Sequence, residues 1–244
     1  MPESLSARGV AEYLAARDAS RDGVLARYAR PDEEQTAVKI MHNPVRMGIR
    51  AVLTDGINEA ELVRLTGKIR EHSEEDESDR IWIRACLRSI EDLRALQPEG
   101  VYSATRARRL DLTISDLRVK SSIDFLGTYT PDNRRMKPRS VAVIVNIPGI
   151  KVANTTRRDM QMQAESELAF RILDAQHIEV DEVHYTDLPR HAIALRYTRR
   201  SERLWKDVVR VCRTIVADFP RIRADLARRA RDRRNYHAAH RRAR

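Results

Sequence analysis

The sequence predicts a mixed fold of class α+β or α/β, in which a helical N-terminal half precedes a mixed five-stranded sheet flanked by helices. From Ser6 to about Gln97 the apolar residues recur at helical spacing. After Gly100 the spacing becomes that of strands, in which alternate residues are apolar. Residues 141–147 contain no polar side chain before Asn146. Because a strand of this kind is covered on both faces, it is expected in the middle of the sheet.

The N-terminal half is predicted to be a series of amphipathic helices. Their apolar patterns cover residues 6–17, 20–30, 32–53, 58–72 and 79–97. Pro44 is expected to break or kink the third of these helices, because proline lacks the amide hydrogen that a helix interior needs. We predict a helical N-terminal module over residues 1–78 and a mixed α/β core over residues 79–220.

The core over residues 79–220 is predicted to hold a helix, a three-stranded meander, a helix, two strands and a helix. The meander comprises a strand over residues 110–119 and the segments "SSIDFLGTYT" and "RSVAVIVNIPG" on either side of a polar turn. In the first strand the alternation shifts by one residue, which indicates a bulge near Ser115 and Asp116. A ferredoxin-like sheet over residues 139–218 is the alternative fold. It would favour RNA binding, although the sequence lacks the exposed aromatic pair of RNA-recognition sheets.

The positive charge of the chain is concentrated at its C-terminal end. The formal net charge is +10, and residues 221–244, which follow Pro220, hold ten arginines and two aspartates. Guanidinium groups pair bidentately with phosphate oxygens and stack on bases. We therefore predict a nucleic-acid-binding arm with DNA as the expected partner; the alternative is a solvated terminus that binds nothing specific. The expected phosphate contacts are Arg228, Arg229, Arg231, Arg233, Arg234, Arg241 and Arg242.

Other features exclude several classes of protein. Cys86 and Cys212 are the only cysteines and lie far apart, so neither a disulfide framework nor a CxxC metal knuckle is available. No apolar run approaches the roughly 18 residues of a membrane helix, and the N-terminus lacks the apolar block of a secretory signal. We expect a cytoplasmic protein without membrane contact. The sequence contains no glycine-rich phosphate loop, no GxSxG elbow and no HExxH motif. No motif therefore supports a hydrolase or a nucleotide-binding protein.

The order of elements from residue 79 carries a family resemblance. A helix, a three-stranded meander with Asp124 on its second strand, a crossing helix and further strands are together similar to the core of the restriction-endonuclease-like superfamily, the PD-(D/E)xK nucleases. The resemblance extends over residues from about 79 to 198. It implies a divalent ion, Mg²⁺ or Mn²⁺, held by Asp124 and by the acid of an acid-x-Lys motif on the central strand. At that motif the chain has Ile144, Val145 and Asn146, so the second acid and the lysine are both missing.

Two interpretations of Asp124 follow from the incomplete motif. In some members of the superfamily the second acid lies on the helix behind the strand, and Glu165 or Glu167 is then the expected partner of Asp124 in a metal-dependent deoxyribonuclease. Alternatively, Asp124 is a hydrogen-bonded residue near a turn without a chemical role. Three further polar residues are candidates for the neighbourhood of the ion: Gln161, Gln163 and Glu91.

A second polar group surrounds the turn of the last predicted hairpin. His184, Asp187 and His191 lie within reach of one another if this hairpin forms. They are candidates for a metal site, but hairpin turns also collect histidine and aspartate because these residues form turns well.

The turn "TPDNRRMKPR" places further cations beside Asp124. Its four basic residues and two at the start of the next helix are predicted to form a basic face that contacts phosphates without reading sequence: Arg134, Arg135, Lys137, Arg139, Arg157 and Arg158. The predicted function is nucleic-acid binding on a nuclease-like core whose catalytic pair is degraded. The alternatives are a divalent-metal-dependent DNase and a non-enzymatic subunit of a larger assembly, which docks on a protein partner through its N-terminal helices.

Overall fold

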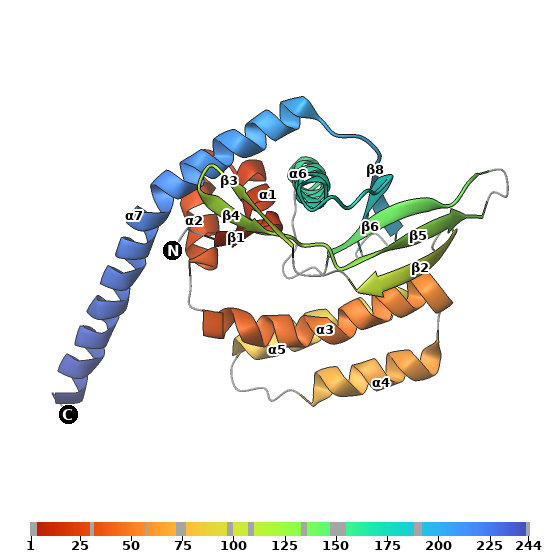
Figure 1. Cartoon of the computed structure of the whole chain (residues 1–244). Helices are drawn as coiled ribbons and strands as arrows, with labels where there is room; N and C mark the ends of the chain where they lie inside the picture. Colours follow the sequence, from red (N-terminus) through yellow and green to blue (C-terminus); the bar gives the residue numbers. More distant parts are fainter. Residues whose placement is uncertain are drawn as a thin grey trace.

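The protein is an α+β protein with a helical N-terminal region and a mixed five-stranded sheet (Figure 1). The computed structural model describes residues 4–29, 32–56, 58–71, 77–96, 100–106, 110–132, 136–146, 155–187 and 192–242. Within these residues, no helix is long and apolar enough to cross a membrane.

The five-stranded sheet has the spatial order β2-β5-β6-β7-β8. Strands β2 (Gly100–Arg106), β5 (Phe125–Pro131) and β6 (Arg139–Asn146) form an antiparallel meander. Helix α6 (Thr155–Ala175) then crosses the sheet and leads to β7 (Glu182–Asp187), which is parallel to β6, and β8 (Ala192–Tyr197) closes the sheet antiparallel to β7. Residues 141–145 of β6 are all buried. The predicted central position of this strand is therefore confirmed.

The first meander strand differs from the prediction. Residues 110–120 form not one bulged strand but a hairpin of β3 (Asp111–Ile114) and β4 (Leu117–Lys120). Ser115 and Asp116 form its two-residue turn, with φ values of 48° and 68°. A turn with two positive φ values reverses the chain, which explains the shift in alternation without a bulge. The hairpin pairs through β4 with β1 (Ser4–Ser6) in a separate three-stranded sheet.

Strand β2, which takes the place of the predicted first strand, had a weak sequence signal. Among the β2 side chains whose burial is described, Tyr102 is the only large buried one, while Val101 and Ser103 are exposed. Its first residue, Gly100, lies so close to β5 that an added Cβ atom would be 2.4 Å from the carbonyl oxygen of Thr130. Glycine therefore suits this position, because a side chain here would keep β2 from pairing closely with β5.

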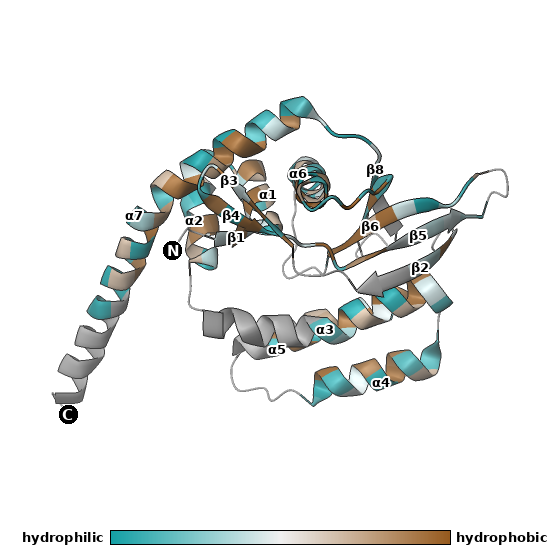
Figure 2. Ribbon diagram, viewed as in Figure 1, coloured by the Kyte–Doolittle hydropathy of each residue, from teal (hydrophilic) through white to brown (hydrophobic). Residues whose placement is uncertain are grey.

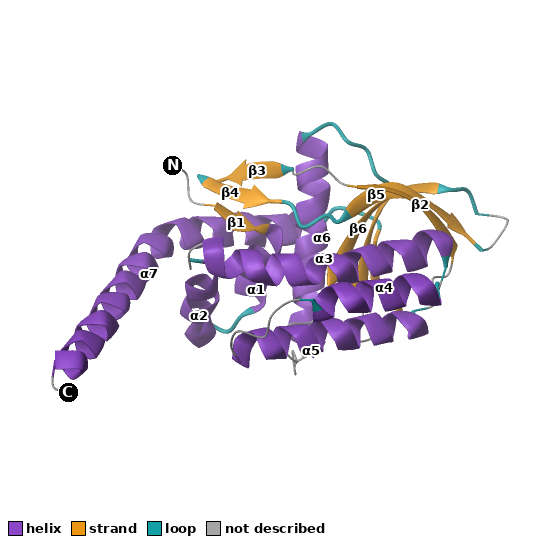
Figure 3. Cartoon of the chain, turned by 90° about the horizontal axis from the view of Figure 1, so that it is seen from below, coloured by secondary structure: helices purple, strands orange, loops and turns teal. Residues whose placement is uncertain are grey.

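Two helical layers cover the two faces of the sheet. Helices α3 (Asp32–Asp55), α4 (Glu59–Arg70) and α5 (Glu77–Asp92), with the short 3₁₀ helix η1 (Leu93–Ala95), pack on the face that carries Val143 (Figures 1 and 3). Helix α6 packs on the opposite face, against Ile144 and Tyr185. Pro44 does not end α3, which continues to Asp55. The buried side chains of Val45 and Ile49 hold the helix on the core just after the proline.

The first two helices pack in a third core with the C-terminal helix. Helices α1 (Ala7–Ala15), α2 (Asp18–Tyr28) and α7 (Glu202–Arg242) share this core with the β3–β4 hairpin and part of α6. The residues assigned to an N-terminal module thus divide between two places, since α1 and α2 contact α6 and α7 whereas α3 and α4 lie under the sheet.

Helix α7 passes through Pro220 and is one continuous helix. Phe219 and Ile222 are buried on either side of the proline, so packing holds the helix together across it. Figure 2 shows hydrophobic residues along the part of α7 that lies against the rest of the chain. The predicted arm is therefore not a separate segment that begins after Pro220. It is the second half of this helix, which extends away from the other elements in Figures 1 and 3.

Candidate functional site

Asp124 is the residue immediately before β5. Its hydrogen bonds place it beside the C-terminal end of β6, where the metal site was predicted. Its backbone N–H donates to the carbonyl of Val143 at 2.9 Å. Its Oδ2 accepts a hydrogen bond from the N–H of Val145 at 2.7 Å, and its Oδ1 lies 2.8 Å from Nε of Arg46 on α3. Burial raises the pKa of Asp124, and the positive charge of Arg46 and the amide of Val145 oppose this rise. Both carboxylate oxygens of Asp124 are thus engaged by protein groups.

Arg8 enters the same place from the first turn of α1. Its Nη2 donates to the carbonyl of Val145 at 2.8 Å, and its Nε lies 3.4 Å from Oε1 of Glu165 on α6. The side chain of Ser6 caps α1 by accepting from the N–H of Gly9 at 3.1 Å, which fixes the start of the helix that carries Arg8. The Arg8 side chain is 19% exposed.

Glu165 is the buried partner of Arg8. Its side chain has no exposed surface, and its Oε2 accepts a hydrogen bond from the hydroxyl of Tyr185 at 3.0 Å. Burial disfavours the charged form of Arg8, but the negative charges of Glu165 and Asp124 help to raise the pKa of Arg8 above its ordinary value. A buried carboxylate needs such a compensating charge, because an unpaired ion is very costly away from water.

The structure therefore brings Asp124 and Glu165 to one end of β6, as expected for this pair, but with two guanidinium groups beside them. Among the residues that the structure describes, no group of three His, Cys, Asp or Glu side chains could hold a metal ion. A divalent ion would have to displace Arg8 from Glu165 and Arg46 from Asp124. The residues as they stand do not fit such an ion.

Glu167 does not belong to this site, although the sequence made it an alternative to Glu165. Two residues along a helix correspond to a rotation of about 200°, so the two side chains leave α6 in nearly opposite directions. Glu167 accepts hydrogen bonds at 2.8 Å from Nε of Arg171, from the hydroxyl of Tyr197 and from the N–H of Ser201. Its role is structural, because it ties β8 and the start of α7 to α6.

The other polar candidates, Glu91, Gln161 and Gln163, have surroundings that differ from those of Asp124. Glu91 is exposed on α5, which belongs to the helical layer on the other face of the sheet from α6. Gln163 is exposed on α6, and Gln161 is half-buried. We find no contact of these three side chains with Asp124 or Glu165 in the described part of the chain.

Of the predicted trio His184, Asp187 and His191, the structure describes only the side chain of His184. His184 is fully buried and bonds on one side to the hydroxyl of Tyr102, at 2.6 Å from Nδ1, and on the other to Glu182, at 2.6 Å from Nε2. Burial lowers the pKa of His184 to about 4, so the neutral ring donates to Glu182 and accepts from Tyr102. Asp187 pairs in register with Asn146, and His191 lies outside the described residues.

One predicted phosphate contact, Arg139, lies beside the buried hydrogen-bonded chain of Tyr102, His184 and Glu182. Arg139 forms an ion pair with Glu182 and is thereby drawn to the sheet. Arg139 thus already has a carboxylate partner within the fold, and its predicted phosphate contact stays a prediction. The sequence signal was available, since Glu182 and His184 are two residues apart on a strand and so share one face.

The remaining basic residues of the turn and of α6 differ in exposure. Lys137 is exposed, whereas Arg157 and Arg158 are half-buried in the first turn of α6 and each has interaction partners. Arg134 and Arg135 lie outside the described residues.

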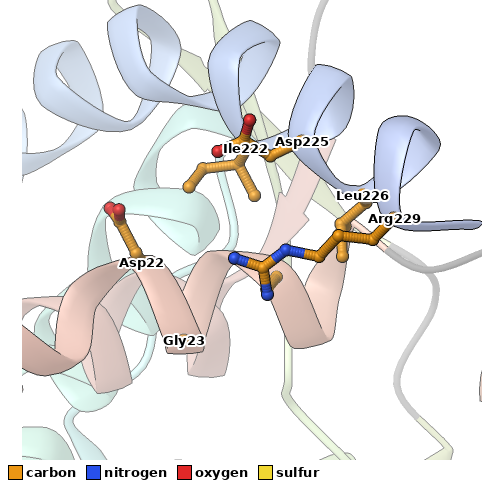
Figure 4. A pocket seen from close by; sticks show the side chains of 7 residues that line it. Asp22, Gly23, Ile222, Asp225, Leu226 and Arg229 are labelled. Atoms are coloured by element: carbon orange, nitrogen blue, oxygen red, sulfur yellow. The ribbon is translucent and has the colours of Figure 1, made fainter. Parts of the chain in front are cut away.

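Helix α7 carries the predicted phosphate contacts of the C-terminal arm, and three of them are described as exposed. Arg228, Arg229 and Arg231 are exposed, and Arg228 forms an ion pair with Asp225 at 3.0 Å. Arg229 lines a small pocket between α2 and α7, together with Asp22 and other residues (Figure 4). The remaining four predicted contacts lie on the same helix, with side chains outside the described part: Arg233, Arg234, Arg241 and Arg242.

Sequence reasoning missed Arg8 and Arg46, which define the chemistry at Asp124 and Glu165. The available signal was the isolated charge of Arg8 in an otherwise small and apolar helix start, where Ala7, Gly9 and Val10 are all buried.

Comparison with protein-family models gave no match, and comparison with curated proteins gave none either. Function is therefore inferred from these residues and their geometry.

Proposed function

We propose that the protein binds nucleic acid in the cytoplasm, with DNA as the expected ligand, through phosphate contacts of the arginine-rich second half of α7. The observation that carries this proposal is the exposure of Arg228, Arg229 and Arg231 on a helix that extends away from the rest of the chain. Phosphate contacts by arginine are the main source of affinity for nucleic acid without sequence preference. The pair of Arg228 with Asp225 is exposed and therefore weak, so it leaves the guanidinium available to a phosphate.

The proposed core is nuclease-like without catalysis. The element order supports this, because α5, the meander β2-β5-β6, α6 and β7 come in the order that the resemblance implies, with the β3–β4 hairpin inserted between β2 and β5. The chemistry supports the loss of catalysis, since the buried apolar Ile144 stands where the superfamily has its second acid and Asn146 stands where it has its lysine. Arg8 and Arg46 supply positive charge to the remaining carboxylates, which is the part that a divalent ion plays in an active nuclease.

The test is a comparison of two triple variants in DNA binding by fluorescence anisotropy at low salt. Arg228→Gln with Arg229→Gln and Arg231→Gln should weaken binding of a labelled DNA about tenfold or more and should flatten the dependence of affinity on salt. The matched control removes three exposed charges from the packed half of α7, at Arg203, Arg210 and Arg213. This control should retain most of the affinity. Equal losses in both variants would contradict a specific role of the second half of the helix.

Failure to bind DNA at low salt would favour the alternative that the protein is a non-enzymatic subunit of a larger assembly. The exposed apolar side chains of Val63 on α4 and Ile81 on α5 are the observation that favours a protein partner at the N-terminal helices. Isolated exposed apolar residues are common on soluble proteins, so this observation is weaker than the arginine set.

A metal-dependent DNase is the second candidate. It is favoured by the meeting of Asp124 and Glu165 at the end of β6, and by the buried Oε1 of Glu165, which has no hydrogen-bond partner. Cleavage of plasmid DNA in Mg²⁺ or Mn²⁺, abolished in Asp124→Asn and in Glu165→Gln, would establish this activity. Under the non-catalytic proposal, the purified chain leaves the plasmid intact with either ion.

A further inference from the structure

We propose that the second half of α7 enters the major groove of B-form DNA as a helix, so that the chain prefers duplex DNA to duplex RNA and to single strands. This inference rests on the proposed function and specifies its substrate. The segment concerned, Leu226–Arg242, is called the distal helix below.

The described side chains of the distal helix beyond Leu226 are exposed, although Arg229 also lines the pocket beside α2. The buried residues of α7 end at Ile222, and Leu226 is the last residue that packs partly against the core. From Ala227 to Asp232, every residue whose side chain is described is exposed. Figures 1 and 3 show from two directions that this part of α7 extends away from the sheets and from the other helices. A long, straight ligand can therefore approach the distal helix without meeting the body of the protein.

The base of the distal helix is fixed to the body. Arg221 forms two hydrogen bonds to the carboxylate of Asp22 on α2, at 3.0 Å and 2.8 Å. Phe219 and Ile222 are buried beside this pair. The helix thus leaves the protein in a defined direction, and its entry into a groove requires little further ordering.

The dimensions of the distal helix match the major groove. A segment of this length rises about 1.5 Å per residue, which gives roughly 25 Å, and an α-helix with side chains is about 10–12 Å wide. The major groove of B-form DNA is about 12 Å wide and admits an α-helix. The major groove of A-form RNA is deep and narrow, and a helix does not enter it. Helical geometry therefore selects DNA among the duplexes.

The directions of the arginines also match a groove. Successive helix residues are rotated by about 100°, so Arg228 and Arg231 lie about 60° apart on one face, whereas Arg229 lies about 100° from Arg228 and about 160° from Arg231. The three side chains thus cover an arc of about 160°, which is wider than one stripe. A helix lying on one row of phosphates would need its cations on one stripe. A helix between the two phosphate rows that border a groove needs them on several sides. Ala227 and Ala230 add little bulk between these arginines.

Aromatic content argues against single strands as the main ligand. Proteins that bind single-stranded nucleic acid combine a positive groove with aromatic side chains on which bases stack. The distal helix contains a single aromatic residue, Tyr236, among eight basic or acidic residues between Arg228 and Arg242. Its composition thus favours phosphate contacts over aromatic stacking on bases.

The first experiment measures binding of the full chain to three labelled probes of one sequence: a DNA duplex of 24 base pairs, the RNA duplex and the DNA single strand. Fluorescence anisotropy at about 0.1 M salt should give at least tenfold tighter binding to the DNA duplex than to either other probe. Equal affinity for all three would overturn the groove proposal and leave the proposed function standing. No binding to any probe would overturn both.

The second experiment separates helix from charge. Ala230→Pro breaks the distal helix without changing its charge, because proline removes a backbone hydrogen bond and clashes with the preceding turn. It should lower the affinity for the DNA duplex about tenfold and make the affinities for the three probes similar. Ala230→Gln, which keeps the helix, is the matched control and should bind as the unchanged chain does. Circular dichroism verifies the loss of helix; unchanged duplex preference in the proline variant would contradict groove entry.

Discussion

Arginine has two different roles at the two ends of this molecule. At the end of β6, Arg8 is 19% exposed and compensates Glu165, whose side chain is completely buried. On the distal helix, Arg228, Arg229 and Arg231 are exposed, and the one ion pair described among them joins Arg228 to the neighbouring Asp225. The difference teaches that the surroundings decide the role: a buried guanidinium stabilises the fold, whereas an exposed one is available to a ligand. Four variants test this comparison through the free energy of unfolding.

The largest effect is expected from Arg8→Ala. The substitution leaves Glu165 buried with only the Tyr185 hydroxyl as a partner, and removal of one member of a buried ion pair typically costs about 3–5 kcal/mol. Urea denaturation at pH 7 measures the loss. Arg27→Ala is the control, because Arg27 pairs with Glu12 on the surface and such a pair contributes about 0–1 kcal/mol. Equal losses in the two variants would remove the distinction between buried and exposed arginine.

The second effect concerns His184 and pH. In the folded chain the pKa of His184 is lowered to about 4, while an unfolded histidine titrates near 6.5. The contribution of the neutral ring is thus fully present above about pH 6.5 and is lost as the pH falls toward 4. The total loss is about 3 kcal/mol. Urea titrations between pH 7 and pH 4.5 should show this loss in the unchanged chain and a smaller one in His184→Gln; parallel curves would contradict the assignment.

A smaller effect is expected from Arg46→Ala. The Arg46 side chain is 36% exposed, so water replaces part of its interaction with Asp124. The amide of Val145 also remains as a donor to the carboxylate. We expect a loss of about 1–2 kcal/mol, in the range of hydrogen bonds to charged groups. A loss as large as that of Arg8→Ala would show that Asp124 depends on its cation as strongly as Glu165 does.

The smallest effect on stability is expected from the triple substitution of Arg228, Arg229 and Arg231 by Gln. These side chains are exposed and glutamine is a good helix former, so the free energy of unfolding should change by no more than about 0.5 kcal/mol. The same variant should lose DNA binding, which separates the two roles of arginine in one protein. A stability loss above about 1 kcal/mol would mean that this part of the helix packs in the folded chain.

Local patterns predicted most of the elements, and their errors had local causes. The helical patterns of the N-terminal half and the buried strand β6 were recognised because their periodicity is strong. Strand β2 was missed because Tyr102 alone marks its buried side, and the hairpin turn at Ser115 and Asp116 was taken for a bulge. Pro220 was taken as a boundary because its effect on an isolated helix is unfavourable, whereas burial of Phe219 and Ile222 outweighs it here.

The candidate site was predictable only in part. The order of elements placed Asp124 on the second strand of the meander and Glu165 on the crossing helix, and in the structure Asp124 directly precedes that strand, β5. The choice between Glu165 and Glu167 did not, because both lie on buried stretches of α6 and only their partners separate them. The sequence marked Arg8 as a charge in an apolar helix start, but no pattern indicated that α1 would pack beside Glu165.

By itself, the sequence determined the periodicity of the helices, the interior position of β6 and the concentration of positive charge at the C-terminal end, since each depends on residues close together in the chain. Only the tertiary structure decided that Arg8 meets Glu165, that Arg46 meets Asp124, and that the arginine-rich segment continues a packed helix. These are contacts between residues far apart in sequence. They are fixed by which faces of helices and strands bury one another, and a single sequence does not specify that choice locally.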